Sequence, residues 1–134
     1  MRFLFFRIVI LLVFVAASLT AAGGNEDTPL LVDFEWLEAN IDRDDLVLVD
    51  FGRPLEEYQA GHIPGARFVE RSSVYEEVDG VSGMLPGQEL AIPHFEAAGI
   101  SRESTVIIYD SVGGLWASRL FWGLEYFGHE RVHV

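Results

Sequence analysis

The chain has 134 residues, half of them apolar, with nine basic residues against 21 acidic ones and no cysteine. This length makes one ordinary domain, and the absence of cysteine excludes disulfides, thiolate metal sites and a cysteine nucleophile. All nine basic residues are arginine, which also excludes lysine Schiff bases and the lysine of P-loops. The formal net charge of −12 argues against nucleic acid as a partner, because phosphate binding needs a basic face.

Residues 1–22 have the pattern of a secretory signal peptide. Arg2 and Arg7 provide a basic start, residues 8–17 carry no polar side chain, and small residues up to Ala22 precede a polar stretch. We therefore expect export to the periplasm or beyond the cell, with cleavage near Ala22. An uncleaved membrane anchor is the alternative, because the apolar length approaches the ~20 residues of a bilayer span if the residues before Arg7 are included.

The first half of the remaining chain, residues 23–134, predicts two helices and two strands. Asp33 is a good N-cap for a short helix. Residues 46–49 form a continuous apolar run, which is typical of a strand covered on both faces. A helix over 55–60 follows, since proline suits its start and glycine its end, and after a turn we expect a strand over 66–69.

The second half continues the alternation of strands and helices. Residues 71–88 lack a clear period and contain several glycines, which predicts a long surface loop. Pro93 is expected to open a short helix that ends at Gly99. A buried strand over 105–109 leads through a glycine-containing turn to a helix over 115–127. The pattern predicts an α/β domain with a mainly parallel central sheet flanked by helices, truncated in a last strand that begins near residue 131.

Two acidic residues follow the two buried strands, at the sheet edge where open α/β sheets bind ligands. Asp50 and Asp110 are each interpreted either as a cap of the following turn or as part of a site. Asp110 opens a loop through Gly114 into a helix, and such a loop points backbone N–H groups inward as an anion cradle. A cysteine there would be a stabilised thiolate, whereas an aspartate is a weak nucleophile and repels anionic substrates.

Two motifs resemble the rhodanese family. Residues 48–66 contain its signature, a strand followed by Asp, a nearby Arg, Glu-x-Tyr and Gly-His-Ile-Pro-Gly-Ala. Residues 106–119 are similar to the family's active-site strand, loop and helix, and residues 127–134 resemble the segment before its closing Asp-Gly-Gly. The resemblance covers about residues 30–134. It implies a rhodanese-like fold, and it requires no organic cofactor and no metal.

One position departs from the family pattern. Rhodaneses carry sulfur as a persulfide on a cysteine, and Asp110 stands at that position. In tandem thiosulfate/3-mercaptopyruvate sulfurtransferases commonly only the second domain holds the cysteine, and the first resembles this chain at Tyr109, Asp110, Gly114, Trp116, Ala117 and Arg119. The resemblance therefore implies the non-catalytic first half of an exported tandem enzyme, inactive alone and without a catalytic residue of its own. Its partner would be a second, catalytic rhodanese domain in cis.

The same resemblance implies which residues wall the partner's pocket. The candidates at the pocket or between the domains are Asp50, Arg53, Asp110, Gly114, Trp116 and Arg119. Arg53 faces an anionic substrate or forms an ion pair with Asp50 or Glu57.

The remaining charged and titratable candidates receive structural roles. Arg119 is expected to pair with Asp110. His62 is expected to hydrogen-bond the backbone of its turn, and His129 and His133 are interpreted as structural rather than as metal ligands.

Two other functions remain open. The first is an inactive rhodanese-fold module that binds or regulates a partner, with membrane contact only through an uncleaved N-terminal segment. The second is Asp110 as a phosphoryl acceptor, which needs a nearby second acid that only Asp50 offers. The predicted last helix is crowded with aromatic residues, and a second apolar face on it would favour association.

Overall fold

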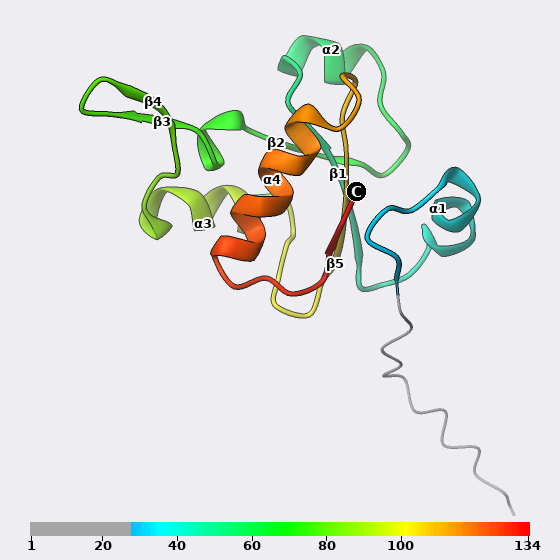
Figure 1. Cartoon of the computed structure of the whole chain (residues 1–134). Helices are drawn as coiled ribbons and strands as arrows, with labels where there is room; N and C mark the ends of the chain where they lie inside the picture. The colour runs from blue at the N-terminus through cyan, green and yellow to red at the C-terminus, as the bar shows by residue number, and fades with distance from the viewer. Residues whose placement is uncertain (1–27) are drawn as a thin grey trace, which may run out of the picture.

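The computed structural model describes residues 28–134, so the predicted signal peptide over 1–22 lies outside the described residues (Figure 1). A sheet of four parallel strands forms the centre of the domain. Its strands, in spatial order, are β2 (Arg67–Val69), β1 (Leu46–Phe51), β5 (Thr105–Tyr109) and β6 (Val132–His133). The predicted α/β class with a mainly parallel sheet is confirmed.

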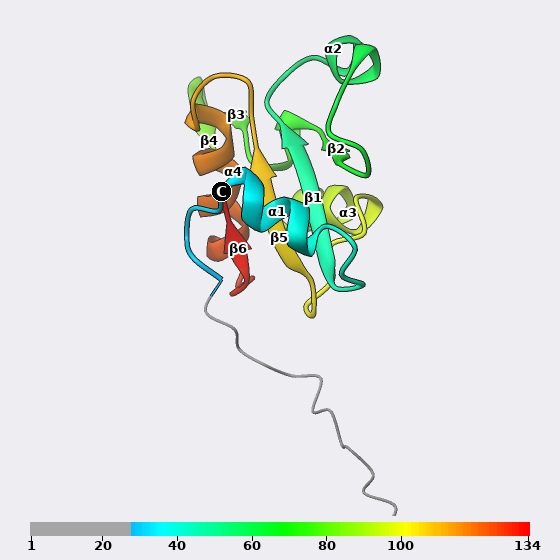
Figure 2. The same ribbon diagram turned by 90° about the vertical axis from the view of Figure 1, so that its right-hand side faces the viewer.

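Helices lie on both faces of this sheet, as Figures 1 and 2 show. α3 (Gln88–Ala97) and α4 (Leu115–Tyr126) cover one face, and α1 (Phe34–Asn40) covers the other. α2 (Leu55–Ala60) buries no residue and stands beyond the end of β1. The side chain of Asp33 accepts the N–H of Trp36 and so caps α1 as predicted.

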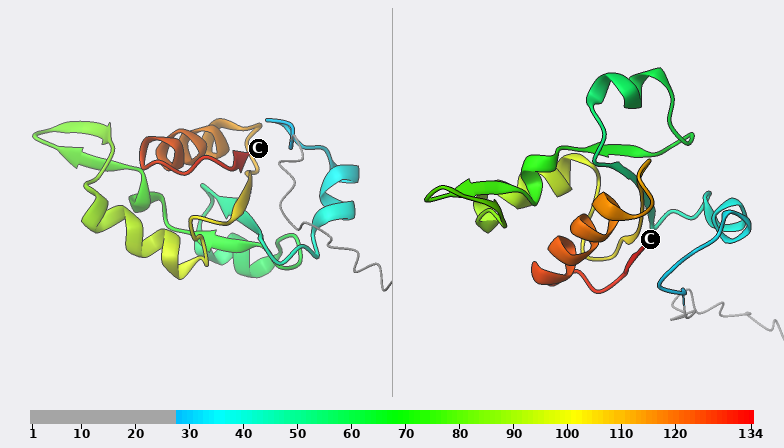
Figure 3. Two further views of the ribbon diagram at one scale, coloured as in Figure 1. Left: turned by 90° about the horizontal axis from the view of Figure 1, so that it is seen from below. Right: turned by 45° about the horizontal axis from the view of Figure 1, so that its top comes forward.

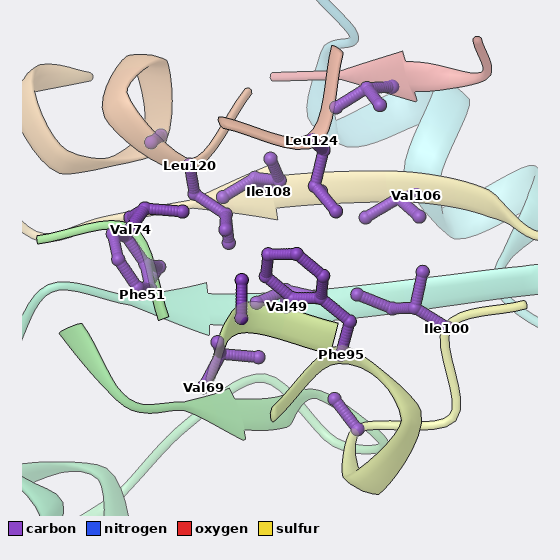
Figure 4. Packing of buried hydrophobic residues seen from close by; sticks show 14 residues of the cluster. Val49, Phe51, Val69, Val74, Phe95, Ile100, Val106, Ile108, Leu120 and Leu124 are labelled. Atoms are coloured by element: carbon purple, nitrogen blue, oxygen red, sulfur yellow. The ribbon is translucent and has the colours of Figure 1, made fainter. Parts of the chain in front are cut away.

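The main core lies between the sheet and the α3–α4 layer (Figure 4). Phe51 of β1 and Ile108 of β5 point toward Leu120 and Leu124 of α4, and Phe95 closes the cluster from α3. A smaller cluster under α1 buries the alternate strand residues. The apolar runs of β1 and β5 are therefore continuous because both faces of these strands are covered.

The segment predicted as a long loop over 71–88 contains regular structure instead. It holds a 3-10 turn (Arg71–Ser73) and an antiparallel hairpin of β3 (Glu76–Val78) and β4 (Val81–Met84). Figure 3 shows this hairpin projecting away from the rest of the domain. Asp79 and Gly80 join its strands with positive φ angles of 53° and 78°, the conformation that an Asp-Gly turn favours.

The prediction that Pro93 opens a helix is also wrong. α3 begins five residues earlier, after Gly87, and Pro93 lies inside it. A proline at that position removes one helical hydrogen bond. The helix tolerates this loss because Ala91 and Phe95, on either side of the proline, are buried in the main core. Packing has outweighed local propensity here.

Candidate functional site

The ends of β1 and β5 lie side by side, because the two strands are parallel neighbours with Asp50 opposite Tyr109. Both strand-end acids, Asp50 and Asp110, therefore lie at one edge of the sheet. The loop before α4 reaches this edge beside α2, at the top of Figure 1. The structure brings together the two candidate regions that the sequence predicted.

Asp50 is fully buried and is held by two side chains. Arg53 donates from Nε to its carboxylate at 2.9 and 3.0 Å and also from Nη2. The Tyr109 hydroxyl donates to Oδ2 at 2.7 Å and itself accepts the N–H of Ile63 at 3.0 Å. Of the two partners considered for Arg53, Asp50 is therefore the one that the structure shows.

The same network shifts two pKa values. Burial, followed by the hydrogen bond to Asp50, raises the pKa of Tyr109 to about 12. The hydrogen bond with Asp50 raises the pKa of the Arg53 guanidinium further above its ordinary value. Tyr109 thus remains a neutral donor and Arg53 a cation at every physiological pH.

The Gly-His-Ile-Pro-Gly-Ala motif connects α2 to β2 through a small clamp. The Tyr58 hydroxyl donates to the carbonyl of Ala66 at 2.8 Å, and His62 Nδ1 donates to the carbonyl of Tyr58 at 2.8 Å. The Tyr58 and His62 rings stack, with centroids 3.9 Å apart. The predicted hydrogen bond from His62 to the backbone is confirmed.

Asp110 occupies the predicted anion cradle with its own carboxylate. Oδ1 accepts the N–H groups of Val112 at 3.0 Å and Gly114 at 2.8 Å. Oδ2 accepts those of Trp116 at 2.7 Å and Ala117 at 3.0 Å. The loop before α4 thus has the shape that binds an anion, and the chain supplies that anion itself.

This arrangement keeps Asp110 ionised. Burial alone would raise its pKa, but the backbone N–H donations together outweigh burial and lower the pKa below the ordinary value. Gly114 allows the turn, because its φ of 91° is one that residues with a Cβ rarely adopt. A carboxylate whose oxygens are already hydrogen-bonded is a poor nucleophile.

A close contact that the sequence did not reveal joins the two strand ends. Gly52 has a φ of 98°, and a Cβ at this position would lie 2.3 Å from the Trp116 side chain. Trp116 therefore packs directly on the backbone after β1. The only signal in the sequence is a glycine placed between a strand and Arg53.

Arg119 does not pair with Asp110 as expected. It donates from Nε to the carbonyl of Val74 at 2.9 Å and from Nη2 to that of Gly83 at 2.7 Å. Its guanidinium also lies over the Trp122 ring, 4.8 Å from the centroid. Because the backbone already satisfies the carboxylate of Asp110, Arg119 instead ties α4 to the hairpin.

A groove of about 380 Å³ lies between α4 and the hairpin. We call it the α4 groove, and it is lined by Tyr75, Gly83, Leu115, Trp116, Ser118, Arg119 and Trp122. Aromatic rings and a guanidinium therefore dominate its wall.

The remaining histidines bond to the backbone. A ring nitrogen of His129 lies 2.9 Å from the carbonyl oxygen of Ser104, and one of His133 lies 3.1 Å from that of Pro29. Burial lowers the pKa of both imidazoles. Within residues 28–134 no three His, Asp or Glu side chains gather as a metal site would require. No helix in this part of the chain has the length and apolarity to cross a membrane.

Known proteins are similar in sequence to most of the described chain. The family model of the rhodanese-like domain matches residues 33–134. The chain is 35% identical over 107 residues to a thiosulfate sulfurtransferase of Pseudomonas aeruginosa, covering 80% of this chain and 39% of that protein. It is 33% identical over 112 residues to the mitochondrial thiosulfate/3-mercaptopyruvate sulfurtransferase 1 of Arabidopsis thaliana, covering 78% of this chain and 30% of that protein.

A solved structure of a 3-mercaptopyruvate sulfotransferase also matches the fold of this chain. The 3-mercaptopyruvate sulfotransferase SseA of Escherichia coli matches with a TM-score of 0.69 and 29% identity, over 79% of this chain and 44% of that one. The chain spans about a third of the length of the curated relatives it matches, 39% of the Pseudomonas protein and 30% of the Arabidopsis protein. The chain therefore belongs to the rhodanese-like domain family, with homology to thiosulfate/3-mercaptopyruvate sulfurtransferases.

Proposed function

We propose that this chain is the non-catalytic, N-terminal half of an exported tandem sulfurtransferase. The complete enzyme transfers sulfur from thiosulfate or 3-mercaptopyruvate through a persulfide on its second domain. The names of the relatives support the substrate class, and the third of their length that this chain spans leaves room for a second domain.

The observation that carries this proposal is the environment of Asp110. A persulfide needs a thiolate, which attacks the outer sulfur of the donor and accepts it as a second sulfur atom. Here the corresponding position carries a carboxylate that accepts N–H groups from Val112, Gly114, Trp116 and Ala117. The loop thus has the geometry of an anion cradle, but Asp110 offers no thiol for the cradle to activate.

The role of this domain is then to form part of the wall of the active-site pocket in the second domain. Residues 51–54 and 112–116 form the two strand ends, and Val112 and Leu115 are exposed there. The Asp50–Arg53 pair holds the first of these loops, and the contact of Trp116 with Gly52 holds the second against it. A rigid rim of this kind positions a catalytic loop that docks on it.

The reading frame after Val134 tests the tandem arrangement. We expect Asp-Gly-Gly, a linker and a second rhodanese domain with a cysteine at the end of its active-site strand. A stop codon directly after Val134 would contradict the arrangement and favour the inactive binding module. The α4 groove supports that second candidate, because it offers a partner an exposed aromatic surface.

A sulfur-transfer assay tests the non-catalytic role. With thiosulfate and cyanide, the chain is expected to form no thiocyanate above background, and clear turnover would overturn the proposal. Asp110→Cys places a thiol in the cradle, and we expect it to gain one sulfur atom from thiosulfate with release of sulfite. Asp110→Ser is the matched control, since it has a similar size and no thiolate. Intact-protein mass spectrometry measures both variants.

The proposal of export depends on the first 22 residues, and it is tested by determining where the mature chain begins. A mature chain that begins near residue 23 supports cleavage by a signal peptidase. An intact N-terminus in the membrane fraction would show the anchored form, and an intact N-terminus in the cytoplasm would contradict export.

A further inference from the structure

The first residues of the described chain extend the sheet beyond β6. The N–H of Val32 donates to the carbonyl of Val134 at 2.8 Å, and the N–H of Val134 donates to the carbonyl of Leu30 at 2.9 Å. Because one residue bonds to both neighbours of Leu31, these bonds have the pattern of a parallel strand pair. Residues 29–32 therefore lie along the end of β6 as a short strand-like segment.

This segment continues into α1, and together they cover one face of the sheet. Figure 2 shows α1 lying across this face. Within residues 28–134 the cluster beneath α1 contains four buried residues, against 14 in the main core under α3 and α4. α1 has only seven residues, and isolated helices shorter than about 12 residues are marginal in water. Residues 29–41, which we call the N-terminal cover, are thus held to the domain by a small apolar contact.

The N-terminal cover ends just before the chain is fastened to the sheet. The carbonyl of Asp45 accepts the N–H of Thr105 in β5 at 2.7 Å. The carboxylate of Asp45 accepts the Thr105 hydroxyl at 2.8 Å and forms a salt bridge with Arg43 at 3.0 Å. These bonds fix Asp45 on the sheet, so the turn over residues 42–44 is the place at which the cover can hinge.

The N-terminal cover also packs behind the candidate site. Trp36 of α1 packs against the same buried cluster as Ile63 and Tyr109. The Tyr109 hydroxyl joins Ile63 to Asp50, through hydrogen bonds of 3.0 and 2.7 Å. Removal of the cover from this face would therefore give water access to the ring that holds this network together.

We propose that the N-terminal cover opens as one unit while the rest of the domain stays folded, and that its docked state holds Tyr109 in place beside Asp50. Regions with few buried contacts open at a lower free energy than the core, and they do so in contiguous cooperative units. Because Val134 bonds to the cover, it belongs to the same unit although it lies at the other end of the described chain. This inference needs no second domain and goes beyond the proposed function.

Amide hydrogen exchange in the full chain tests the common opening. The amides of Leu37 in α1 and of Val134 are expected to have equal protection factors, at least about tenfold below that of Ile108 in the central strand β5. Protection of Leu37 and Val134 equal to that of Ile108 would mean that the cover opens only when the whole domain unfolds. Either this result or unequal protection of Leu37 and Val134 would overturn the proposal.

Proline substitution tests the bonds that hold the cover to β6. Val32→Pro removes the N–H that donates to Val134, and it is expected to lower the protection of Leu37 by about tenfold while that of Ile108 is unchanged. Leu31→Pro is the matched control, because in a parallel pair the N–H of Leu31 points away from β6 and its side chain is 70% exposed. If the two prolines change the protection of Leu37 equally, the proposed role of these bonds is wrong.

The link between the cover and the candidate site is measured in the same variants. The amide of Ile63 donates to Tyr109, so Val32→Pro is expected to lower its protection together with that of Leu37. The amide of Gly114 donates within the cradle and does not belong to this network, so its protection should be unchanged. Unchanged protection of Ile63 when that of Leu37 has fallen, or an equal loss at Gly114, would contradict the link.

Discussion

The ends of β1 and β5 hold their aspartates in opposite ways. Asp50 is fully buried, and its partners are the side chains of Arg53, three residues away, and Tyr109, 59 residues away. Asp110 is half-buried, and it accepts hydrogen bonds from backbone N–H groups within seven residues. The first site thus depends on tertiary contacts, whereas the second is a local cap that its own loop builds. Because a buried network loses more when one of its members is removed, substitution of Asp50 is expected to cost more stability than substitution of Asp110.

The largest loss of stability is expected from substitution of Asp50, at the end of β1. Asp50→Ala leaves the Arg53 guanidinium, whose side chain is 17% exposed, without its partner and removes the acceptor of the Tyr109 hydroxyl. We expect a loss of about 3 kcal/mol in the free energy of unfolding, measured in urea. Adding Arg53→Met to Asp50→Ala should recover part of the loss. A loss no larger than that at Asp110 would contradict the contrast between the two ends.

Gly52→Ala tests the contact that joins the two ends. The new Cβ would meet Trp116 at 2.3 Å on a backbone with a φ of 98°, so both a clash and strain are introduced. We expect a loss of about 2 kcal/mol in the free energy of unfolding. Gly61→Ala is the matched control, since its φ of 170° is extended and open space surrounds it. If both variants lose the same stability, the close contact is not responsible.

Asp110→Ala tests the local cap and should cost less, about 1.5 kcal/mol near neutral pH. Because folding lowers the pKa of Asp110, its contribution is present above the ordinary value of 3.8 and is lost as the pH falls through the lower folded value. The stability difference between wild type and variant should therefore shrink in acid. Urea unfolding at a series of pH values measures this, and a difference that stays constant to the lowest pH would contradict it.

Tyr109→Phe should have the smallest effect, about 1 kcal/mol, because only hydrogen bonds are lost. Since folding raises the pKa of Tyr109 from 10.0 to about 12, this contribution is complete below pH 10 and is lost as the pH rises toward 12. Titration of tyrosinate absorbance should show one high-pH group in the wild type that is absent from the variant. A normal titration of all tyrosines would contradict the buried network at Asp50.

The sequence was informative wherever a structural feature is local. The apolar runs predicted β1 and β5, and the glycine-containing turn predicted the loop before α4 and its cradle. The Asp79-Gly80 turn carried an equally local signal for the hairpin, and the glycines around it obscured the two short strands. Pro93 was misplaced because the burial of Ala91 and Phe95, rather than propensity, extends α3 across it.

The features of the candidate site likewise fall into those that the sequence predicted and those that only the tertiary structure revealed. The correspondence of Asp110 to the cysteine position of the rhodanese family is a prediction that the motif resemblance allows from the sequence alone, because it compares residue types and needs no structure. The hydrogen-bond partners of Arg119 could not be predicted from the sequence, since Val74 and Gly83 lie 45 and 36 residues away along the chain. The contact of Gly52 with Trp116 and the bond from Tyr109 to Asp50 likewise join distant segments. Local backbone preferences act within a few residues, so the sequence by itself determined the strands and the caps, and its residue types alone show that no thiol is present. Only packing of the whole domain decided which side chains meet, because those contacts arise when the parallel sheet brings distant segments to one edge.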